Sequence, residues 1–582
     1  MNKAPKQTNS ITRNRQEIVN QKTVPDKKKS LLLPLFIVFC IPVLLYLQTV
    51  SFGLTNFDDD GIISNNITFI SQLRNIPKAF TIDAYLGKTC EFYRPLQTVS
   101  YMFDVHFSNT TALWMFHLTN VLLFGFIACF LFFVLLRFSI PPTLALVCSV
   151  AYCVNPLFTS SVAWIPARGD LLLTMFSLLT LIFFIDFIKT GKITYMILHW
   201  LTFTIALFSK ETAAFLPFLL LLYFLVFTNN KLFDTKNIMT VILYALSGFF
   251  WFCIRSKAIG DVSDRSDQFQ VGIFALLNNL KSIPEAFTGF IFPINIAVIP
   301  GFSVIKEIIG IVILGFIIFL LLKNKERKLG EKLFGLFWFF LLLIPTMFFR
   351  HLFIDYLNHR FLLPFIGILL LLLFIVPKQW MQEKQGIITK CIIVLCIILG
   401  IITAKNISHY ASPSAFYDAA IDENPQSGLA YNNRGNLKFM DKSYQAALED
   451  FTHAAATNNT IAETYLNIGL TQFNLNNFQE AIINFDKYIT YRPNKPETYV
   501  NKGMALGSLG DFDGSIKNFT KAISLDPQLW GAYGNRAIAR FQIKDYKGAI
   551  ADCEKVLQLN PNDPKAMDIK AKAQQELQNN KE

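Results

Sequence analysis

Long apolar stretches alternate with short polar segments over the first 400 or so residues of the chain. A helix that spans a membrane needs about 20 mostly apolar residues. Eleven stretches approach this length, at about 31–50, 114–136, 142–162, 171–188, 193–208, 212–228, 238–254, 304–322, 333–349, 361–377 and 387–404. The first is not expected to be a cleaved signal peptide, because it follows a long polar tail and lacks a clear small-residue cleavage site. The pattern predicts a polytopic helical membrane domain over residues 31–404.

Beyond this domain the apolar stretches stop and a 34-residue period begins. Each period carries a Tyr, two small residues and a turn residue, at Tyr431, Tyr465, Tyr499 and Tyr533, at Gly435, Gly469, Gly503 and Ala537, at Ala447, Ala481, Ser515 and Ala549, and at Pro425, Asn459, Pro493, Pro527 and Pro561. The small residues allow two helices to cross closely, and the Pro closes each unit. The period predicts tetratricopeptide (TPR) repeats.

The predicted TPR array covers residues 405–563. It has four full repeats over 428–563, preceded by a half repeat with Tyr417, Ala420 and Pro425. The charged stretch 564–582 is expected to be a capping helix or tail. Stacked TPR helices build a concave groove that binds extended peptides or protein surfaces. The predicted fold is therefore all-α, a membrane domain of about 11 spans followed by a TPR α-solenoid.

Composition supports this division. Hydrophobic residues make up 53% of the 582 residues and Phe alone occurs 58 times, whereas charged residues make up 16%, against about 25% in soluble domains. A soluble enzyme and a disordered chain are both excluded. Seven of the nine Cys lie in apolar stretches, so no disulfide framework is expected.

Basic residues predict the orientation, because they concentrate in cytoplasmic loops. With the N-terminus inside, the inner segments hold 20 Lys or Arg in about 67 residues, against 12 in about 134 residues of the outer loops. Residues 1–30 then form a cytoplasmic basic tail, and eleven crossings place the TPR array outside. Residues 273–300, which contain three Pro, are expected to be a re-entrant or interfacial element. We favour a bacterial inner membrane with a periplasmic array over the endoplasmic reticulum.

Basic and acidic residues stand together in nearly every predicted outer loop. The charged residues are Asp58 to Asp60 and Arg94 in the first loop, Arg168 and Asp170 in the second, Lys210 and Glu211 in the third, and Asp355, His359 and Arg360 in the last. Ionised groups at a membrane boundary are costly unless paired or hydrated, so they indicate function. Converging Arg and Lys suit a phosphate, and a nearby carboxylate suits a general base. The loops predict a site for an anionic lipid headgroup and a hydroxyl to be deprotonated.

Structural interpretations of these residues remain open. The three Asp could form a solvated turn or bind calcium, and Arg94 could pair with Glu91. Arg168 with Asp170, and Lys210 with Glu211, could be local ion pairs that cap helices. His117 and Asn120 could be a structural hydrogen-bonded pair, and His359 could be a packing residue. No Walker-type loop, zinc spacing or nucleophile elbow stands out, so ATP-driven transport and metalloprotease chemistry lack support. We predict no metal site and leave the need for a divalent metal open.

Several short motifs together resemble a known family. They are Phe57-Asp58-Asp59, Tyr93-Arg94-Pro95-Leu96, the stretch Phe116-His117-Leu118-Thr119-Asn120, Val162-Ala163-Trp164 with Arg168-Gly169-Asp170, Ser209-Lys210-Glu211, and His359-Arg360-Phe361-Leu362-Leu363-Pro364. Their order and spacing resemble the transmembrane and TPR-containing O-mannosyltransferases. The similarity covers nearly the whole chain. That family resembles glycosyltransferases of the GT-C fold, which use polyprenyl-phosphate sugars on the non-cytoplasmic face.

The resemblance implies roles for individual residues. Asp58 and Asp59 match the catalytic Asp-Asp pair, one of them being the base. Arg94 and Arg360 match Arg residues of the family's motifs. Together with Arg168 and Lys210, which the converging basic charges of the outer loops add, they are expected to bind the donor phosphate, with possible support from Tyr93, His117, Asp170, Glu211 and His359. Relatives often have Arg-Tyr where this chain has Arg360-Phe361, which removes a hydroxyl.

Three functional hypotheses follow. The first is inverting transfer of mannose or another hexose from a polyprenyl phosphate to Ser or Thr of exported proteins, which the TPR groove binds. The second moves the sugar to a lipid or cell-surface glycan. The third is a non-catalytic membrane scaffold that gathers proteins through its TPR array. Membrane lipid, the lipid-linked donor and an acceptor polypeptide are the expected partners, and nucleic acid is not.

Overall fold

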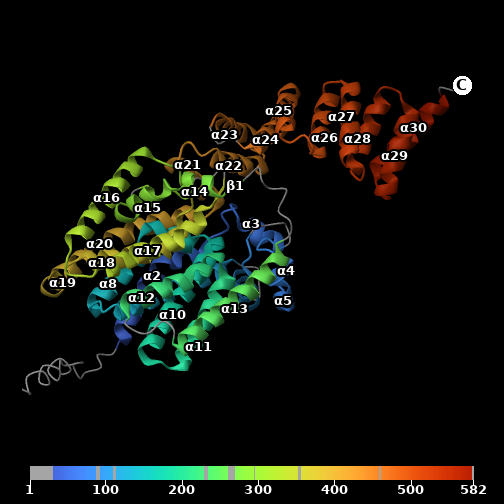
Figure 1. Cartoon of the computed structure of the whole chain (residues 1–582). Coiled ribbons are helices and arrows are strands. Elements are labelled where there is room, and N and C mark those ends of the chain that lie inside the picture. The colour runs from blue at the N-terminus through green and yellow to red at the C-terminus, as the bar shows by residue number, and fades with distance from the viewer. Residues whose placement is uncertain are drawn as a thin grey trace, which may run out of the picture.

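The structure, a computed structural model, describes residues 31–86, 92–108, 113–228, 234–259, 269–293, 295–351, 356–457 and 461–579. These residues form a helical bundle and a curved row of helix pairs that projects from one end of it (Figure 1). Two three-residue strands, β1 (Phe269–Val271) and β2 (Phe349–His351), pair antiparallel. The all-α fold predicted from the sequence is confirmed.

A helix occupies each of the eleven predicted spans. These helices are α2 (Leu32–Tyr46), α7 (Trp114–Arg137), α8 (Pro142–Cys153), α10 (Arg168–Thr190), α11 (Ile193–Ser209), α12 (Leu216–Phe227), α13 (Thr235–Ala258), α16 (Val304–Lys323), α17 (Leu329–Met347), α18 (Pro364–Ile375) and α20 (Gln385–Ile407). Among the described residues, seven helices are long and apolar enough to cross a membrane, and three more are shorter apolar helices. In addition, α8 and the segment Pro156–Ala163 form one pair bent by 52°. The number of crossings therefore stays a prediction.

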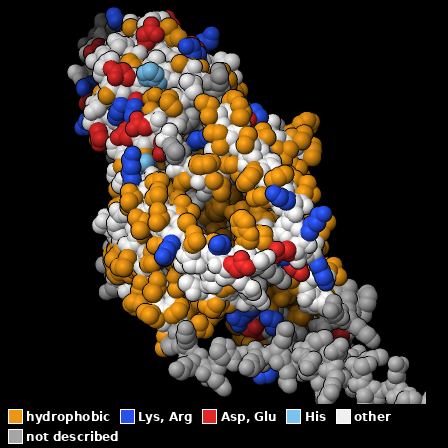
Figure 2. Space-filling view, turned by 90° about the vertical axis from the view of Figure 1, so that its left-hand side faces the viewer, with side chains coloured by type: hydrophobic (Ala, Val, Ile, Leu, Met, Phe, Trp, Pro, Cys, Tyr) orange, Lys and Arg blue, Asp and Glu red, His pale blue; other side chains and the backbone are white. Residues whose placement is uncertain are grey.

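The flank of the bundle is apolar. Orange side chains cover it between a charged upper part and a charged lower rim (Figure 2). Phe249, Ile311 and Ile401 are examples, each more than 60% exposed. In water this flank would expose far more apolar surface than a soluble protein tolerates. The chain is a membrane protein.

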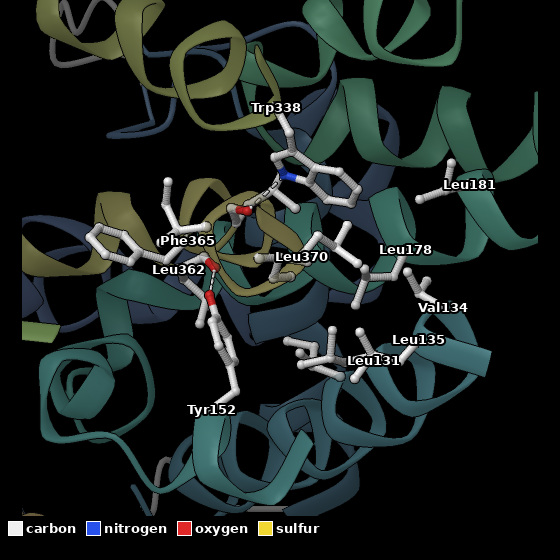
Figure 3. Close-up of a cluster of buried hydrophobic side chains, with 14 of the residues drawn as sticks. Leu131, Val134, Leu135, Tyr152, Leu178, Leu181, Trp338, Leu362, Phe365 and Leu370 are labelled. Atoms are coloured by element: carbon white, nitrogen blue, oxygen red, sulfur yellow. Dashed lines mark hydrogen bonds between the residues drawn. The ribbon is translucent and has the colours of Figure 1, made fainter. Parts of the chain in front are cut away.

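The interior of the bundle is packed with aromatic and aliphatic side chains from α7, α8, α10, α17 and α18 (Figure 3). Two buried polar side chains donate hydrogen bonds to backbone carbonyls just before the start of α18. Trp338 Nε1 donates to the Leu363 carbonyl at 2.9 Å, and the Tyr152 hydroxyl donates to the Leu362 carbonyl. Both bonds fix the segment that follows Arg360, and so help to position that side chain.

Shorter elements join the spans. After α2 the chain continues through η1 (Leu47–Ser51), α3 (Asp59–Ile62), η2 (Ser64–Asn66), α4 (Ile67–Ile70), η3 (Leu73–Asn75), α5 (Ile76–Ala79) and α6 (Pro95–Ser108). The later connections hold η4 (Pro156–Phe158), α9 (Thr159–Ala163), η5 (Ile165–Ala167), η6 (Glu211–Phe215), α14 (Ile273–Asn279), α15 (Ser282–Ile291), η8 (Asn358–Phe361), α19 (Lys378–Glu383) and η9 (Ser408–Tyr410). Residues 273–300 thus contain two short helices, neither long enough to span a bilayer.

The row of helix pairs has the predicted 34-residue repeat. It consists of α21 (Pro413–Glu423), α22 (Gly428–Met440), α23 (Tyr444–Ala456), α24 (Ala462–Asn474), α25 (Phe478–Tyr491), α26 (Pro496–Ser508), α27 (Phe512–Leu525), α28 (Trp530–Gln542), α29 (Tyr546–Leu559) and α30 (Pro564–Asn579). The repeated glycines are required by packing. A Cβ on Gly469 would lie 2.6 Å from the Phe485 ring, and one on Gly503 equally close to Phe519.

Candidate active site

The acidic turn after η1 gives its adjacent carboxylates different surroundings. Asp59 is buried, and one of its oxygens accepts hydrogen bonds from the backbone N–H and the hydroxyl of Thr55, at 2.5 and 2.6 Å. Asp58, the residue before α3, instead lines a cavity that also holds several basic side chains. The turn therefore uses Asp59 to hold its own backbone and presents Asp58 to the cavity.

This cavity has a volume of about 530 Å³ and lies where five connections between the spans meet. Four of them contribute the charged or titratable side chains Asp58, Arg94, Lys210, Glu211, Arg255, His359 and Arg360, and the connection between α8 and α10 contributes Trp164 and Pro166. Six of the predicted site residues are thus brought together from segments up to about 300 residues apart. A pocket of this size suits a small polar ligand group.

Ion pairs across the connections orient the basic groups. Lys210 Nζ lies 2.7 Å from both oxygens of Asp170, and His359 Nε2 lies 3.8 Å from one of them. Arg94 Nε lies 3.5 Å from Glu211, which also accepts the backbone N–H of Tyr93 at 2.7 Å. The predicted supporting residues Asp170 and Tyr93 therefore lie behind the cavity and hold residues that line it.

The interpretation of Lys210 and Glu211 as a local ion pair is wrong. Lys210 pairs with Asp170 of α10 and not with its neighbour Glu211, which pairs with Arg94. The alternative partner of Arg94, Glu91, lies outside the described residues, as does Asp355. The two pairs join segments that are far apart in the sequence, so proximity along the chain could not indicate them.

Burial and charge shift the pKa values of the titratable groups that line the cavity. Burial, and next the neighbouring Asp59, raises the pKa of Asp58 to about 7. Burial lowers the pKa of Lys210 to about 8, opposed by Asp170, and lowers that of His359 to about 3. Burial also lowers the pKa of Arg360 to about 10. At pH 7 the cavity therefore holds cationic Lys210 and Arg360, a neutral His359, and a carboxyl poised to exchange a proton.

Arg168 does not reach this cavity, contrary to the expectation that it binds the donor phosphate. Its side chain is fully buried and pairs with Asp104 of α6. It also donates to Asn120 Oδ1 at 2.8 Å and to the Phe116 carbonyl at 2.5 Å. The guanidinium is therefore bonded to groups inside the protein, where it links α6, α7 and α10.

His117 and Asn120 do not bond each other either. His117 Nε2 lies 3.4 Å from the Gly53 carbonyl, and Asn120 Nδ2 donates to the Val162 carbonyl at 3.2 Å, in addition to accepting from Arg168. His117 therefore supports the segment between α2 and the acidic turn from behind, and contributes no group to the cavity.

Sequence reasoning missed two contributors. Arg255, at the end of α13, lines the cavity with its guanidinium 5.7 Å from the Trp251 ring. An Arg just beyond an apolar span and near a Trp was the available signal. Asp104, the partner of Arg168, carried no signal, because α6 was not predicted as a helix. Among the described residues, no group of three His, Cys, Asp or Glu could hold a metal ion.

An apolar groove adjoins the cavity. It lies between α11, α12 and α13, has a volume of about 530 Å³, and shares Ala214 and Trp251 with the cavity. Its other walls are almost entirely aliphatic and aromatic, including the exposed side chains Phe218, Val241 and Phe252. The polar cavity and the apolar groove thus meet at Trp251.

Comparison with known families separates the two parts of the chain. Residues 106–253 match the family model of dolichyl-phosphate-mannose-protein mannosyltransferases. Over these residues the membrane part is therefore similar to that family. TPR family models match residues 462–495, 496–529 and 531–563. The resemblance to TPR-containing O-mannosyltransferases is confirmed, and α7, α10, α11 and α13 all fall within the mannosyltransferase match or overlap it.

Solved structures similar to the chain include TPR proteins. YrrB, a TPR protein with an unusual peptide-binding site, is 21% identical over 27% of this chain and 82% of its own, with a TM-score of 0.26. The first TPR of Spaghetti (RPAP3), bound to an HSP90 peptide, is 28% identical over 20% and 92%, with a TM-score of 0.20. A thermophilic TPR protein from Thermus thermophilus is 17% identical over 30% and 93%, with a TM-score of 0.24. No curated protein matches the chain.

Proposed function

We propose that this chain transfers mannose, or a related hexose, from a polyprenyl phosphate to Ser or Thr hydroxyls of exported proteins on the non-cytoplasmic face. The observation that carries the proposal is the cavity, where Asp58 faces four basic side chains in a membrane domain similar to the mannosyltransferase family. With Asp58 and Glu211 as the carboxylates among the cavity's charged groups, the basic groups are in excess. Such a chamber favours an anionic phosphate beside a base.

The reaction is written as an inverting displacement. The acceptor hydroxyl oxygen attacks the anomeric carbon of the sugar, and its proton passes to the Asp58 carboxylate. The bond between the anomeric carbon and the phosphate oxygen breaks, and both of its electrons leave with the polyprenyl phosphate. Arg94 and Arg360 stabilise the phosphate through planar, bidentate hydrogen bonds, and Lys210 acts as a nearby point charge. No covalent intermediate with the enzyme is required.

The apolar groove provides a place for the polyprenyl chain. The chain would leave the phosphate at Trp251 and continue between α12 and α13, where the wall is apolar and open to the bilayer. Burial of isoprenoid carbon there contributes about 25 cal/mol per Å². The arrangement binds the donor through its tail and leaves the charged groups for the transition state.

The loops support the orientation. The connections predicted to lie outside meet at the cavity, whereas Arg137, Lys189 and Arg327, from connections predicted to lie inside, line a separate cavity of about 510 Å³. Arg137, Lys189 and Arg327 are thus at the helix ends opposite to those that border the Asp58 cavity. The alternation of loops therefore agrees with a cytoplasmic N-terminus and a TPR array on the same face as Asp58, where it would bind the acceptor polypeptide.

The test measures transfer of labelled mannose from polyprenyl-phosphate mannose to a Ser peptide, in membranes that contain the full chain. Asp58→Asn is expected to lower the rate by about 10²–10⁴-fold, the usual contribution of a general base. Asp60→Asn is the matched control, because Asp60 belongs to the same turn and does not line the cavity. Full transfer by Asp58→Asn would contradict the proposal.

The same assay separates the other two functions. If sugar appears on lipid or glycan but never on Ser or Thr peptides, the acceptor is not protein. If neither pool gains sugar with any polyprenyl-phosphate donor, the scaffold is the better account. A glucose donor run in parallel tests the sugar.

A further inference from the structure

The first helix of the TPR array packs onto the turn that carries Asp58. Phe416 and Tyr417 of α21 belong to one buried cluster with Trp164, and Phe57 packs against it. The Phe57 ring lies 5.5 Å from that of Phe416 and 5.6 Å from that of Trp164. The residue directly before Asp58 is therefore held between a TPR helix and the membrane domain.

Hydrogen bonds join the same two parts. The backbone N–H of Gly53 donates to the Ala411 carbonyl at 3.3 Å, and the N–H of Val298 donates to the Glu423 carboxylate at 3.1 Å. The array is thus attached to the bundle along the whole of α21. It is not a separate body on a loose linker.

Tyr417 reaches the turn itself. Its side chain is fully buried, and its hydroxyl donates to the Asn56 carbonyl at 2.6 Å. Asn56 has a φ of +53°, a left-handed conformation that Asn adopts more readily than most residues but that still requires support. Asn433 of α22 donates in turn to the Tyr417 hydroxyl at 3.2 Å. One hydroxyl therefore links the first full TPR repeat to a left-handed residue two positions before Asp58.

We propose that Tyr417 is a positioning residue for Asp58, so that the TPR array completes the active site as well as binding the acceptor. This inference rests on the function proposed above. A general base must lie about 2.6–3.2 Å from the proton that it accepts, and a misplacement of about 1 Å can cost 10²-fold in rate. Asp59 holds the turn from the membrane side through Thr55, and Tyr417 holds it from the TPR side.

The test compares Tyr417→Phe with Tyr499→Phe in the full-length chain. Tyr499 is a matched control, because its hydroxyl also donates to a backbone carbonyl, that of Pro493 at 3.0 Å, but within the array. Each variant is assayed on a short Ser peptide and on a long unfolded acceptor. Tyr417→Phe is expected to lower kcat about tenfold on both, about 1.4 kcal/mol in the barrier, with KM unchanged. Tyr499→Phe should stay within about twofold.

A pH profile adds a readout that loss of stability would not shift. The titratable and charged groups around Asp58 are Asp59, Asp60, Tyr85, Arg94, Lys210, Glu211, Arg255, His359, Arg360 and Tyr417 itself. Tyr417→Phe removes only the Tyr417 hydroxyl, whose pKa burial holds above its ordinary value, so no charge near Asp58 changes. A looser turn admits water to Asp58 and favours its charged form, so the acid limb of the profile should move to lower pH in this variant alone.

Two results would overturn the proposal. One is a folded Tyr417→Phe with normal kcat and pH profile. The other is a raised KM for the long acceptor with normal kcat on the short peptide, which would leave Tyr417 a docking role only. If Tyr417→Phe does not fold, Asn433→Ala frees the Tyr417 hydroxyl from α22 and leaves its bond to the Asn56 carbonyl, and an unchanged kcat in that variant would overturn the claim that the TPR repeats beyond α21 complete the site. Failure of the proposed function differs, because Asp58→Asn would then keep full transfer.

Discussion

Replacing Arg168 by Met tests whether this residue supports the fold or binds the donor. Met has a similar length and no charge, so Arg168→Met removes the ion pair to Asp104 and the bonds to Asn120 and the Phe116 carbonyl. Asp104 would remain buried, with the Thr119 hydroxyl at 2.6 Å as its remaining side-chain donor of this set. The variant therefore leaves a charge without its counter-ion in the interior.

Arg168→Met is expected to lower the free energy of unfolding by about 3–5 kcal/mol, the usual result of breaking a buried ion pair by removing one partner. This lowers the ratio of folded to unfolded chain by about 10²–10⁴-fold, since 1.36 kcal/mol is tenfold. Adding Asp104→Asn to Arg168→Met removes the stranded charge and should recover part of the loss. The two changes are therefore expected to be non-additive.

Arg94→Met is the matched comparison. Arg94 lines the cavity, and its side chain is 18% exposed beside Glu211, so its pair contributes about 0–1 kcal/mol to stability. We expect Arg94→Met to fold normally and to lose transfer, and Arg168→Met to lose folded protein first. The assays are the half-life of the monodisperse peak in detergent at fixed temperature, because unfolding of such a chain is irreversible, and transfer per folded molecule.

One result would refute this reasoning. If Arg168→Met is as stable as the wild type and its KM for the donor rises, the guanidinium contacts the phosphate, as the sequence motif suggested.

Two further predictions concern pH and the lipid groove. Below pH 7 Asp58 takes up a proton and cannot act as a base, so the transfer rate should fall about tenfold per pH unit there. Above about pH 8 Lys210 loses its charge, and the transfer rate should fall again. A flat profile of rate against pH from about pH 5 to 9 would contradict both assignments. Trp251→Ala should raise KM several-fold for a long polyprenyl donor and leave the KM of a short-chain donor nearly unchanged, because Trp251 joins the cavity to the apolar groove. Equal effects on both donors, measured by initial rates, would show that the groove does not hold the polyprenyl chain.

Much of the fold followed from the sequence because its signals are local. Hydropathy marks a spanning helix through about 20 consecutive residues, and all eleven predicted stretches are helices. The 34-residue period marks the repeats, and its Gly positions proved to be places where no Cβ fits beside an aromatic ring. In the fourth repeat Ala537 and Cys553 replace the Gly and Phe of the other copies, and both are fully buried in one cluster.

The candidate site was predicted less evenly. The charges at the outer ends of the spans pointed to a common chamber, and Asp58, Arg94, Lys210, Glu211, His359 and Arg360 do line one. Partners were not predictable, because a motif such as Arg168-Gly169-Asp170 suggests a pair within itself. In a helix, however, residues two apart point in different directions. Arg168 and Asp170 accordingly face different neighbours, α6 and the loop after α11.

By itself, the sequence determined that the chain has a helical membrane domain, that TPR repeats follow this domain, and that charged residues stand at the ends of its apolar helices. Apolar run length and repeat period determine these features, and neither depends on which helices are neighbours. Only the tertiary structure decided that Asp58 faces the cavity while Asp59 binds Thr55, and that Tyr417 touches the Asn56 turn. These contacts join residues as far as 361 positions apart. Their geometry arises when the helices pack, because a polar group that becomes buried is costly unless it finds a hydrogen-bond partner.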